Sequence, residues 1–227
     1  MSSEPIYHFE PDHQEVPAGL HLIAGLTGFT DAGGVLNQFS EHIFANLETA
    51  QVLHFDNDEL LDYRSRRPVM FFEKDHIEDY EPASLALYLV HDEVNQPFLF
   101  LHGYEPDFRW DAFTDAVLRL IKRLQVKDVT WLHSIPFPIP HTRETGVTVS
   151  GNRMDIVNQL SEWKPRLRSL ETFCTSWNLK LPKLVFQLLV TFCCARTIWQ
   201  ITTFRKQQFQ HLSWFRLQQD LSFQPMI

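Results

Sequence analysis

The sequence lacks several features that mark common classes of protein. It contains no run of about 18 uncharged apolar residues, which a membrane-spanning helix would need. Residues 1–20 are polar and acidic and lack the apolar core of a secretory signal peptide, so we do not expect export. Only three cysteines occur among 227 residues, without the spacing of a zinc site, which fits a reducing compartment. We therefore expect a cytoplasmic protein that does not enter a membrane.

Basic charge is also scarce. The chain has 20 Lys and Arg against 28 Asp and Glu, a net charge of −8. A protein that binds nucleic acid by neutralising phosphates needs a basic surface, so we expect no nucleic-acid partner. The 44% of hydrophobic residues exclude a disordered chain, and the length suits one α/β domain or two small ones.

The composition changes after Pro165. Residues 1–165 hold 26 acidic and 12 basic residues, whereas residues 166–227 hold 2 acidic and 8 basic residues. All eight glycines lie at or before Gly151, and all three cysteines lie after Pro165. We expect an α/β domain over residues 1–165 and a separate basic tail over residues 166–227, which composition alone would fit to a helical subdomain.

Apolar runs and helical spacing alternate along the first part. Helical spacing predicts helices over 32–47 and 110–124, whereas 83–90 fits either a strand or a helix. Helices between apolar strands predict a largely parallel sheet with both faces covered. The predicted strands are 20–27, 51–55, 69–72, 97–102 and 127–133.

Ligands of such sheets collect beyond the carboxyl ends of the strands. The segment Gly28–Gly34 follows the first of these strands, and backbone N–H groups at a helix start could hold an anion there. Asp31 would repel that anion, and the alternative is that Asp31 caps the helix. The segment is neither a Rossmann fingerprint nor a P-loop, so we expect no nucleotide cofactor.

The segment Gly103–Trp110 follows a second strand. Glu105 and Arg109 could form an ion pair or orient a ligand, with Trp110 as an apolar wall. The alternative is that Asp107 caps the following helix while Glu105 and Arg109 only brace the loop.

A third segment, Ile139–Arg143, follows a proline-rich loop that could present His141 and Arg143 or form a rigid corner. A metal site would require His102, His133 and His141 to converge, and we expect none. We predict that at least two of the three segments touch, with an acid–arginine contact between them. The cluster Arg64, Arg66 and Arg67 is a candidate subunit contact.

Taken together, these segments resemble the bacterial branch of the proteasome assembly chaperone 2 family. The matching text is L-T-G-F-T-D-A-G-G (Leu26–Gly34), F-D-N-D-E-L-L-D-Y-R-S-R-R-P (Phe55–Pro68), G-Y-E-P-D-F-R-W-D-A-F (Gly103–Phe113) and P-H-T-R (Pro140–Arg143). The resemblance implies a three-layer α/β/α domain, similar to the nucleoside phosphorylase-like fold, that forms oligomers. It also implies a protein partner, since eukaryotic and archaeal members bind proteasome subunits.

Function must still be argued from the site. The first hypothesis is a non-enzymatic assembly or scaffolding protein that binds proteasome or protease subunits. The alternative is a small-ligand binder or enzyme that uses a strand-end pocket. Some members of the family are described as carboxylate–amine ligases, but no ATP-binding motif occurs here.

The resemblance ends near residue 160. Relatives continue with a P-G motif, an L-L-E helix and a P-H-Y-L-A segment, which are absent here. If codons from Leu170 are read two bases downstream, the genetic code permits P-G-N-F-L across Ser169–Cys174 and P-H-Y-L-A-D across Ala195–Ile201. It also permits A-A-G-Y-V across Gln187–Phe192. We therefore hypothesise that the chain from about Arg166 is a frameshift product, natural or from a sequencing or cloning error.

The rival interpretation is a genuine, membrane-seeking helix over 184–201, although no cap residues frame it. A frameshift would leave the C-terminal part of the fold atypical or incomplete, and its tail poorly packed.

Overall fold

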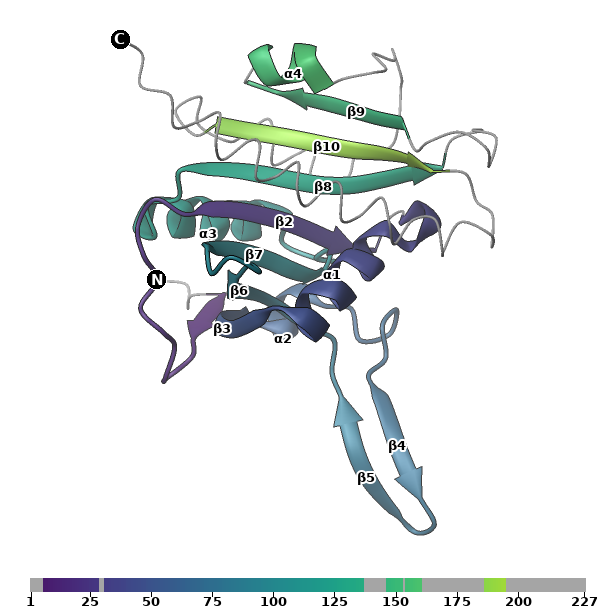
Figure 1. Ribbon diagram of the computed structural model, residues 1–227. Helices are drawn as coiled ribbons and strands as arrows, with labels where there is room; N and C mark the ends of the chain where they lie inside the picture. Colours follow the sequence, from purple (N-terminus) through teal and green to yellow (C-terminus); the bar gives the residue numbers. More distant parts are fainter. Residues whose placement is uncertain (1–5, 29–30, 137–145, 153, 161–185, 195–227) are drawn as a thin grey trace.

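The computed structural model describes residues 6–28, 31–136, 146–152, 154–160 and 186–194. Eight strands form one sheet in the order β1-β3-β6-β7-β2-β8-β10-β9 (Figure 1). Their bounds are β1 Tyr7–Phe9, β2 His21–Thr27, β3 Glu48–Phe55, β6 Leu85–His91, β7 Pro97–Tyr104, β8 Asp128–Pro136, β9 Gly146–Gly151 and β10 Phe186–Cys194.

The α/β class is confirmed, but the sheet is mixed. The pairs β7–β2, β2–β8 and β8–β10 are parallel, and the other four pairs are antiparallel. The ambiguous segment 83–90 supplies β6, which a tight turn at Asp92–Gln96 joins to β7. A connection this short can only make an antiparallel pair, because a parallel pair needs a long crossover.

Helices cover both faces of the sheet, which gives the expected three layers. The helix α1 (Val35–Asn46) packs on one face through Leu36 and Ile43, together with Ile23 of β2. The helix α3 (Trp110–Arg123) packs on the other face with Leu22 of β2. Neighbouring residues of β2 thus enter different cores, as alternation along a strand requires. The remaining described helices are η1 (Ala32–Gly34), α2 (Asn57–Leu60) and α4 (Met154–Leu160).

The strand β10 comes from the sequence after Pro165. It pairs in parallel with β8, with Phe186 opposite Asp128, and antiparallel with β9. It therefore lies between β8 and β9 in the main sheet (Figure 1). The rival interpretation of 184–201 as a helix is wrong for the described residues, because 186–194 form this strand.

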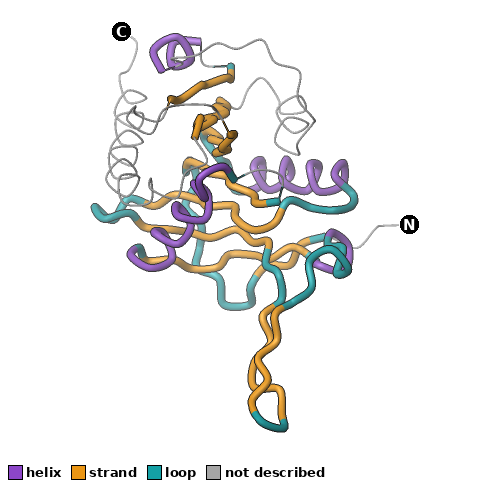
Figure 2. Tube along the Cα trace, turned by 90° about the vertical axis from the view of Figure 1, so that its right-hand side faces the viewer, coloured by secondary structure: helices purple, strands orange, loops and turns teal. Residues whose placement is uncertain are grey.

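A two-stranded hairpin, β4 (Val69–Glu73) with β5 (His76–Glu81), pairs with itself and not with the main sheet. It projects away from the body of the molecule (Figures 1 and 2). The strand predicted at 69–72 thus exists, but it lies outside the sheet in which we expected it.

No helix in the described ranges is both long enough and apolar enough to cross a membrane.

Candidate functional site

The carboxyl ends of the parallel strands meet at one edge of the sheet, as predicted. Thr27 at the end of β2 lies opposite Tyr104 at the end of β7, and the N–H of Glu105 donates to the carbonyl of Thr27 at 2.7 Å. Beyond β2, Asp31 forms a β-bridge with Ser134 of β8. The first two predicted segments are therefore neighbours.

Asp31 occupies the helix start that might otherwise hold an anion. Its carboxylate accepts from the N–H groups of Leu36 and Asn37, at 2.9 and 3.2 Å, in the first turn of α1. The same carboxylate accepts from the buried hydroxyl of Ser134 at 2.9 Å. Asp31 thus caps α1 and ties it to β8, and its negative charge sits where an anionic ligand would bind.

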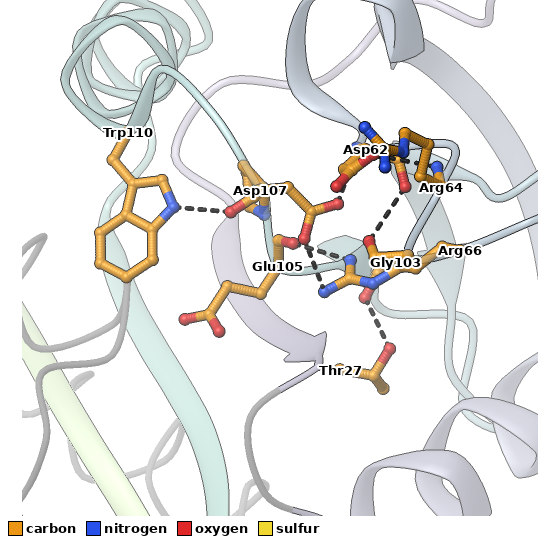
Figure 3. Close-up of polar contacts among 10 residues, drawn as sticks. Thr27, Asp62, Arg64, Arg66, Gly103, Glu105, Asp107 and Trp110 are labelled. Atoms are coloured by element: carbon orange, nitrogen blue, oxygen red, sulfur yellow. Dashed lines mark hydrogen bonds and ion pairs between the residues drawn. The ribbon is translucent and has the colours of Figure 1, made fainter.

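The guanidinium of Arg66 lies at the centre of the site, at the carboxyl ends of β2 and β7. Its Nη1 donates to the carbonyl of Glu105 at 2.8 Å, and its Nη2 lies 3.2 Å from Oδ1 of Asp107 (Figure 3). The guanidinium carbon also lies 5.4 Å from the centroid of the Tyr104 ring, within cation–π range. Arg66 therefore lies at the ends of β2 and β7, where we expected a ligand, and its guanidinium binds groups of the chain there.

Asp107 joins this centre to the chain that carries Arg66. Its Oδ2 accepts from the N–H of Asp62 at 2.9 Å, and its own N–H donates to the carbonyl of Leu60 at 2.8 Å. The prediction that Asp107 caps α3 is wrong, since the residue at the N-cap is Arg109, in left-handed conformation with φ 55°. The Asp107 carboxylate turns instead toward the α2 side, where Arg66 offers it a positive charge.

Tyr104 and Asn57 hold α2 against the sheet. The Tyr104 hydroxyl donates to Oδ1 of Asn57 at 2.6 Å, and Nδ2 of Asn57 donates to the carbonyl of Ala83 at 2.7 Å. Burial raises the pKa of the Tyr104 hydroxyl well above its usual value, so it stays a neutral donor.

Arg109 and Trp110 lie at the start of α3 and bind nearby groups. Arg109 forms an ion pair with Glu59 of α2, with side chains 39% and 45% exposed. The Trp110 indole N–H donates to the carbonyl of Pro106 at 2.6 Å. Arg109 does not make the predicted acid–arginine contact between two of the three segments. Its partner Glu59 belongs to a fourth segment, which folds over the strand ends.

Two glycines let the backbone approach this centre. A Cβ on Gly103 would lie 2.2 Å from the carbonyl oxygen of Ser84, and a Cβ on Gly28 would lie 2.8 Å from Nη2 of Arg66. Both have positive φ, 145° and 149°, which side chains disfavour. The close fit of Arg66 therefore depends on glycine at the end of β2.

The two histidines near these strand ends, His102 and His133, are largely buried. His102 stacks on Phe100 at 5.1 Å between ring centroids, and burial lowers the pKa of its imidazole. Burial also lowers the pKa of His133, while the negative charge of Asp31 opposes that shift. In the part of the chain that the structure describes, no group of three or more His, Cys, Asp or Glu is arranged to hold a metal ion.

His141 and Arg143 lie outside the described residues. The arginine cluster divides, since Arg66 belongs to the centre described above whereas Arg64 and Arg67 are exposed. Sequence reasoning missed Arg66, Glu59 and Ser134 as partners of the predicted residues. The sequence did contain one indication of the position of Arg66. Gly28 follows a strand, and a glycine there leaves room for a large side chain from elsewhere in the chain.

A small cavity of about 10 Å³ lies between the sheet and α3. Only apolar side chains line it, including those of Leu22, Leu99 and Val117. Ligand pockets have volumes of roughly 300–1,000 Å³ and carry a few polar groups, so this cavity is a packing defect and not a binding site.

Comparison with known proteins identifies a family and a shared fold. The model of the PAC2 family matches residues 25–203. A solved structure of a Corynebacterium glutamicum protein of unknown function is 33% identical, with 85% of this chain and 74% of that chain covered and a TM-score of 0.80. A Mycobacterium tuberculosis protein of unknown function is 30% identical, with 86% and 70% covered and a TM-score of 0.78.

A more distant structure has a functional name. A Mycobacterium tuberculosis proteasome-assembly chaperone homologue is 18% identical, with 79% of this chain and 77% of that chain covered and a TM-score of 0.70. That likeness shows the fold. None of the curated proteins is similar enough to this chain to count as a match.

Proposed function

The chain belongs to the PAC2 family, and on that premise we propose that it is a non-enzymatic assembly or scaffolding protein that binds a protein partner. The observation that carries the proposal is the pairing of the candidate ligand-binding groups with the chain itself. Of the candidates that the structure describes, Asp31 caps α1, Arg109 binds Glu59 and the Trp110 indole donates to the Pro106 carbonyl. Arg66, a candidate subunit contact, binds Asp107 at the same strand ends. Polar groups that already have partners at hydrogen-bonding distance are poorly placed to recognise a small ligand.

The partners that we propose are proteasome or protease subunits, met in the cytoplasm. Support for this class comes from the fold shared with a Mycobacterium tuberculosis proteasome-assembly chaperone homologue and from the name of that protein. The acidic balance of −8 also suits a partner with a basic contact surface.

Affinity purification of the tagged full chain from its native cell, followed by mass spectrometry, tests the proposal. We expect subunits of a proteasome or protease to be enriched over a control with the tag on an unrelated acidic protein. The enriched subunit, purified alone, should then bind the purified chain directly. Recovery of the chain without any such subunit, together with a rise in its melting temperature on adding a small metabolite, would contradict the proposal and favour a ligand-binding function.

A further inference from the structure

The projecting hairpin of β4 and β5, residues 69–81, is here called the arm. Every residue of the arm is exposed, and in the described part of the chain its two strands pair only with each other (Figures 1 and 2). It carries six of the eleven large apolar side chains that are exposed in the described residues. A two-stranded hairpin is only marginally stable by itself in water, and contiguous exposed apolar side chains mark interaction sites. The arm therefore has the features of an interaction surface.

One face of the arm is entirely apolar. Residues directly opposite each other across two paired strands lie on the same face. Met70 lies opposite Tyr80. Phe72, two residues along β4 and hence on the same face as Met70, lies opposite Ile77. These four side chains form the apolar face of the arm, with exposed fractions of 56%, 57%, 63% and 59% for Met70, Tyr80, Phe72 and Ile77.

The opposite face, here called the acidic face, carries every acidic residue that has a partner in the register of the arm. Its members are Val69, Phe71, Glu73, His76, Asp79 and Glu81. The arm as a whole has five Asp and Glu against one Lys, for a formal charge of −4. Such a charge favours a partner that carries Lys and Arg, and it disfavours the anionic surface of a membrane. The arm thus fits a partner that presents apolar groups to one face and basic groups to the other.

The two edges of the arm differ in how open they are. The register pairs Phe71 with Asp79 but the next residue, Phe72, with Ile77. Glu78 is therefore an extra residue of β5, a β-bulge. A bulge and acidic side chains protect an edge from pairing with another strand, and three of the six residues of β5 are acidic. The strand β4 has no bulge and only one acidic residue among five, so its outer N–H and C=O groups are open to a further strand.

We propose that the arm binds an extended segment of a partner protein as a third strand on the open edge of β4. In this segment apolar residues alternate with Lys or Arg, because successive side chains of a strand point to opposite faces. Its apolar side chains cover the apolar face, and its basic side chains reach the acidic face. Backbone hydrogen bonds give such strand addition its affinity, and the alternate side chains give its specificity.

The inference rests on the proposed function in one respect, that the chain has a protein partner. It adds the surface that takes up the partner and the sequence pattern which that surface selects. Synthetic peptides replace the partner in the test, so no proteasome or protease subunit is needed. A failure of the arm to bind a strand and a failure of the proposed function are therefore seen in separate experiments.

Fluorescence anisotropy of a labelled peptide measures binding to the purified full chain. The probe is the peptide K-V-K-V-K-V-K-V-K, which alternates basic and apolar residues. One control peptide, E-V-E-V-E-V-E-V-E, reverses the charge. The other, K-K-K-V-V-V-V-K-K, keeps the composition of the probe but not its alternation. We expect the probe to bind, with dissociation constants at least about tenfold larger for both controls.

A variant of the apolar face tests whether the probe binds the arm. Met70→Thr with Phe72→Thr removes the large apolar side chains that β4 gives to this face, and threonine still favours a strand. We expect the dissociation constant of the probe to rise by at least about tenfold. Both residues are exposed, so circular dichroism should show native folding.

A variant of the acidic face tests the charge pattern. Asp79→Asn with Glu81→Gln removes two negative charges from this face, and we expect the dissociation constant of the probe to rise about fivefold at low salt. The matched control, Asp12→Asn with Glu15→Gln, removes two exposed charges outside the arm and should change binding by less than about twofold. An equal loss in the control would show that the probe responds only to net charge, and it would overturn the proposal.

Hydrogen exchange followed by mass spectrometry locates the added strand. With the probe bound, we expect slower amide exchange over residues 69–73 in the wild type, because the outer N–H groups of β4 gain acceptors. The variant Met70→Thr with Phe72→Thr should lose most of this protection at the same probe concentration.

Four outcomes would overturn the inference. The first is a probe that does not bind at hundreds of micromolar, or that binds the apolar-face variant as tightly as the wild type. The second is protection confined to segments other than 69–73. The third is exchange over 69–73 that slows in the free chain as its concentration rises, which would mean that a second copy covers this edge. The fourth is co-sedimentation of the wild type, but not of the apolar-face variant, with phosphatidylglycerol vesicles, which would make the arm a membrane contact.

Discussion

Replacing Arg66 with methionine removes a charge from the strand edge while keeping most of the apolar stem. The Asp107 carboxylate, only 20% exposed, loses its ion pair at 3.2 Å and keeps the N–H of Asp62. The Glu105 carbonyl loses its donor at 2.8 Å. A hydrogen bond to a charged group is worth about 1.5–3 kcal/mol, so we expect the free energy of unfolding to fall by about 2–3 kcal/mol.

Arg109→Ala is the matched comparison on the same edge. Its ion pair with Glu59 is more exposed, at 39% and 45%, and solvent screens it. Exposed pairs contribute about 0.2–1 kcal/mol, so we expect a loss of about 0.5 kcal/mol. Arg66, whose carboxylate partner is the less exposed of the two, is therefore the arginine that stabilises this part of the fold most.

Urea unfolding, followed by circular dichroism, measures both changes. A double-mutant cycle of Arg66→Met with Asp107→Asn should give a coupling energy of about 1–2 kcal/mol, because the two side chains are in contact. A loss for Arg109→Ala as large as that for Arg66→Met, or a coupling energy near zero, would refute the account of this edge.

The structure supports three further predictions, and the sequence supports a fourth. Gly103→Ala would place a Cβ 2.2 Å from the Ser84 carbonyl oxygen and should lower the free energy of unfolding in urea by about 2–4 kcal/mol. The control Gly19→Ala, which has nothing within 4 Å of its Cβ, should cost about 1 kcal/mol from its positive φ alone. Equal costs for the two variants would contradict the clash. Burial lowers the pKa of His102 from 6.5, so the unfolded chain binds the extra proton first and stability falls as pH drops below about 6.5. His102→Phe should reduce that loss in thermal unfolding between pH 7 and pH 5, and an unchanged slope in His102→Phe would reject the assignment. Asp31→Ala should cost about 1–2 kcal/mol through loss of the α1 cap, with a smaller cost for Asp31→Asn, and a fall below 0.3 kcal/mol would show that the cap carries little. Resequencing the gene should show a shifted frame from about codon 166, and an intact frame whose close relatives share the L-V-F-Q-L-L-V-T-F-C-C text would disprove the frameshift.

Local patterns predicted the elements that local physics decides. The apolar run at 20–27 became β2, and the helical spacing at 110–124 became α3, since each pattern matches the burial that its element needs. The segment 83–90 stayed ambiguous, because an apolar run in a covered sheet alternates poorly and resembles a buried helix.

The centre of the strand edge was not predictable in the same way. Arg66 reaches Glu105, 39 residues away in sequence, by folding α2 over the strand ends. No periodicity records such a contact, and a run of arginines more often marks exposed surface. The sequence likewise did not predict that the hairpin of β4 and β5 is exposed, because V-M-F-F at 69–72 has the composition of a buried strand.

The pairing of β10 with β8 and β9 does not depend on which side chains the strand carries. Its ladder with β8 and β9 uses backbone groups, which every residue except proline supplies. The shifted reading of Gln187–Phe192, A-A-G-Y-V, is also apolar and would fit a strand. The frameshift therefore stays a prediction about the gene, and so does the boundary at residue 165.

The most direct test of an assembly function is native mass spectrometry of a reconstituted assembly reaction. The purified chain is mixed with separately purified proteasome or protease subunits, and the complexes are followed over time. The account predicts that the chain binds incomplete assemblies and speeds the appearance of the complete particle. A chain that never occurs in a complex with these subunits, and leaves the rate of assembly unchanged, would contradict it.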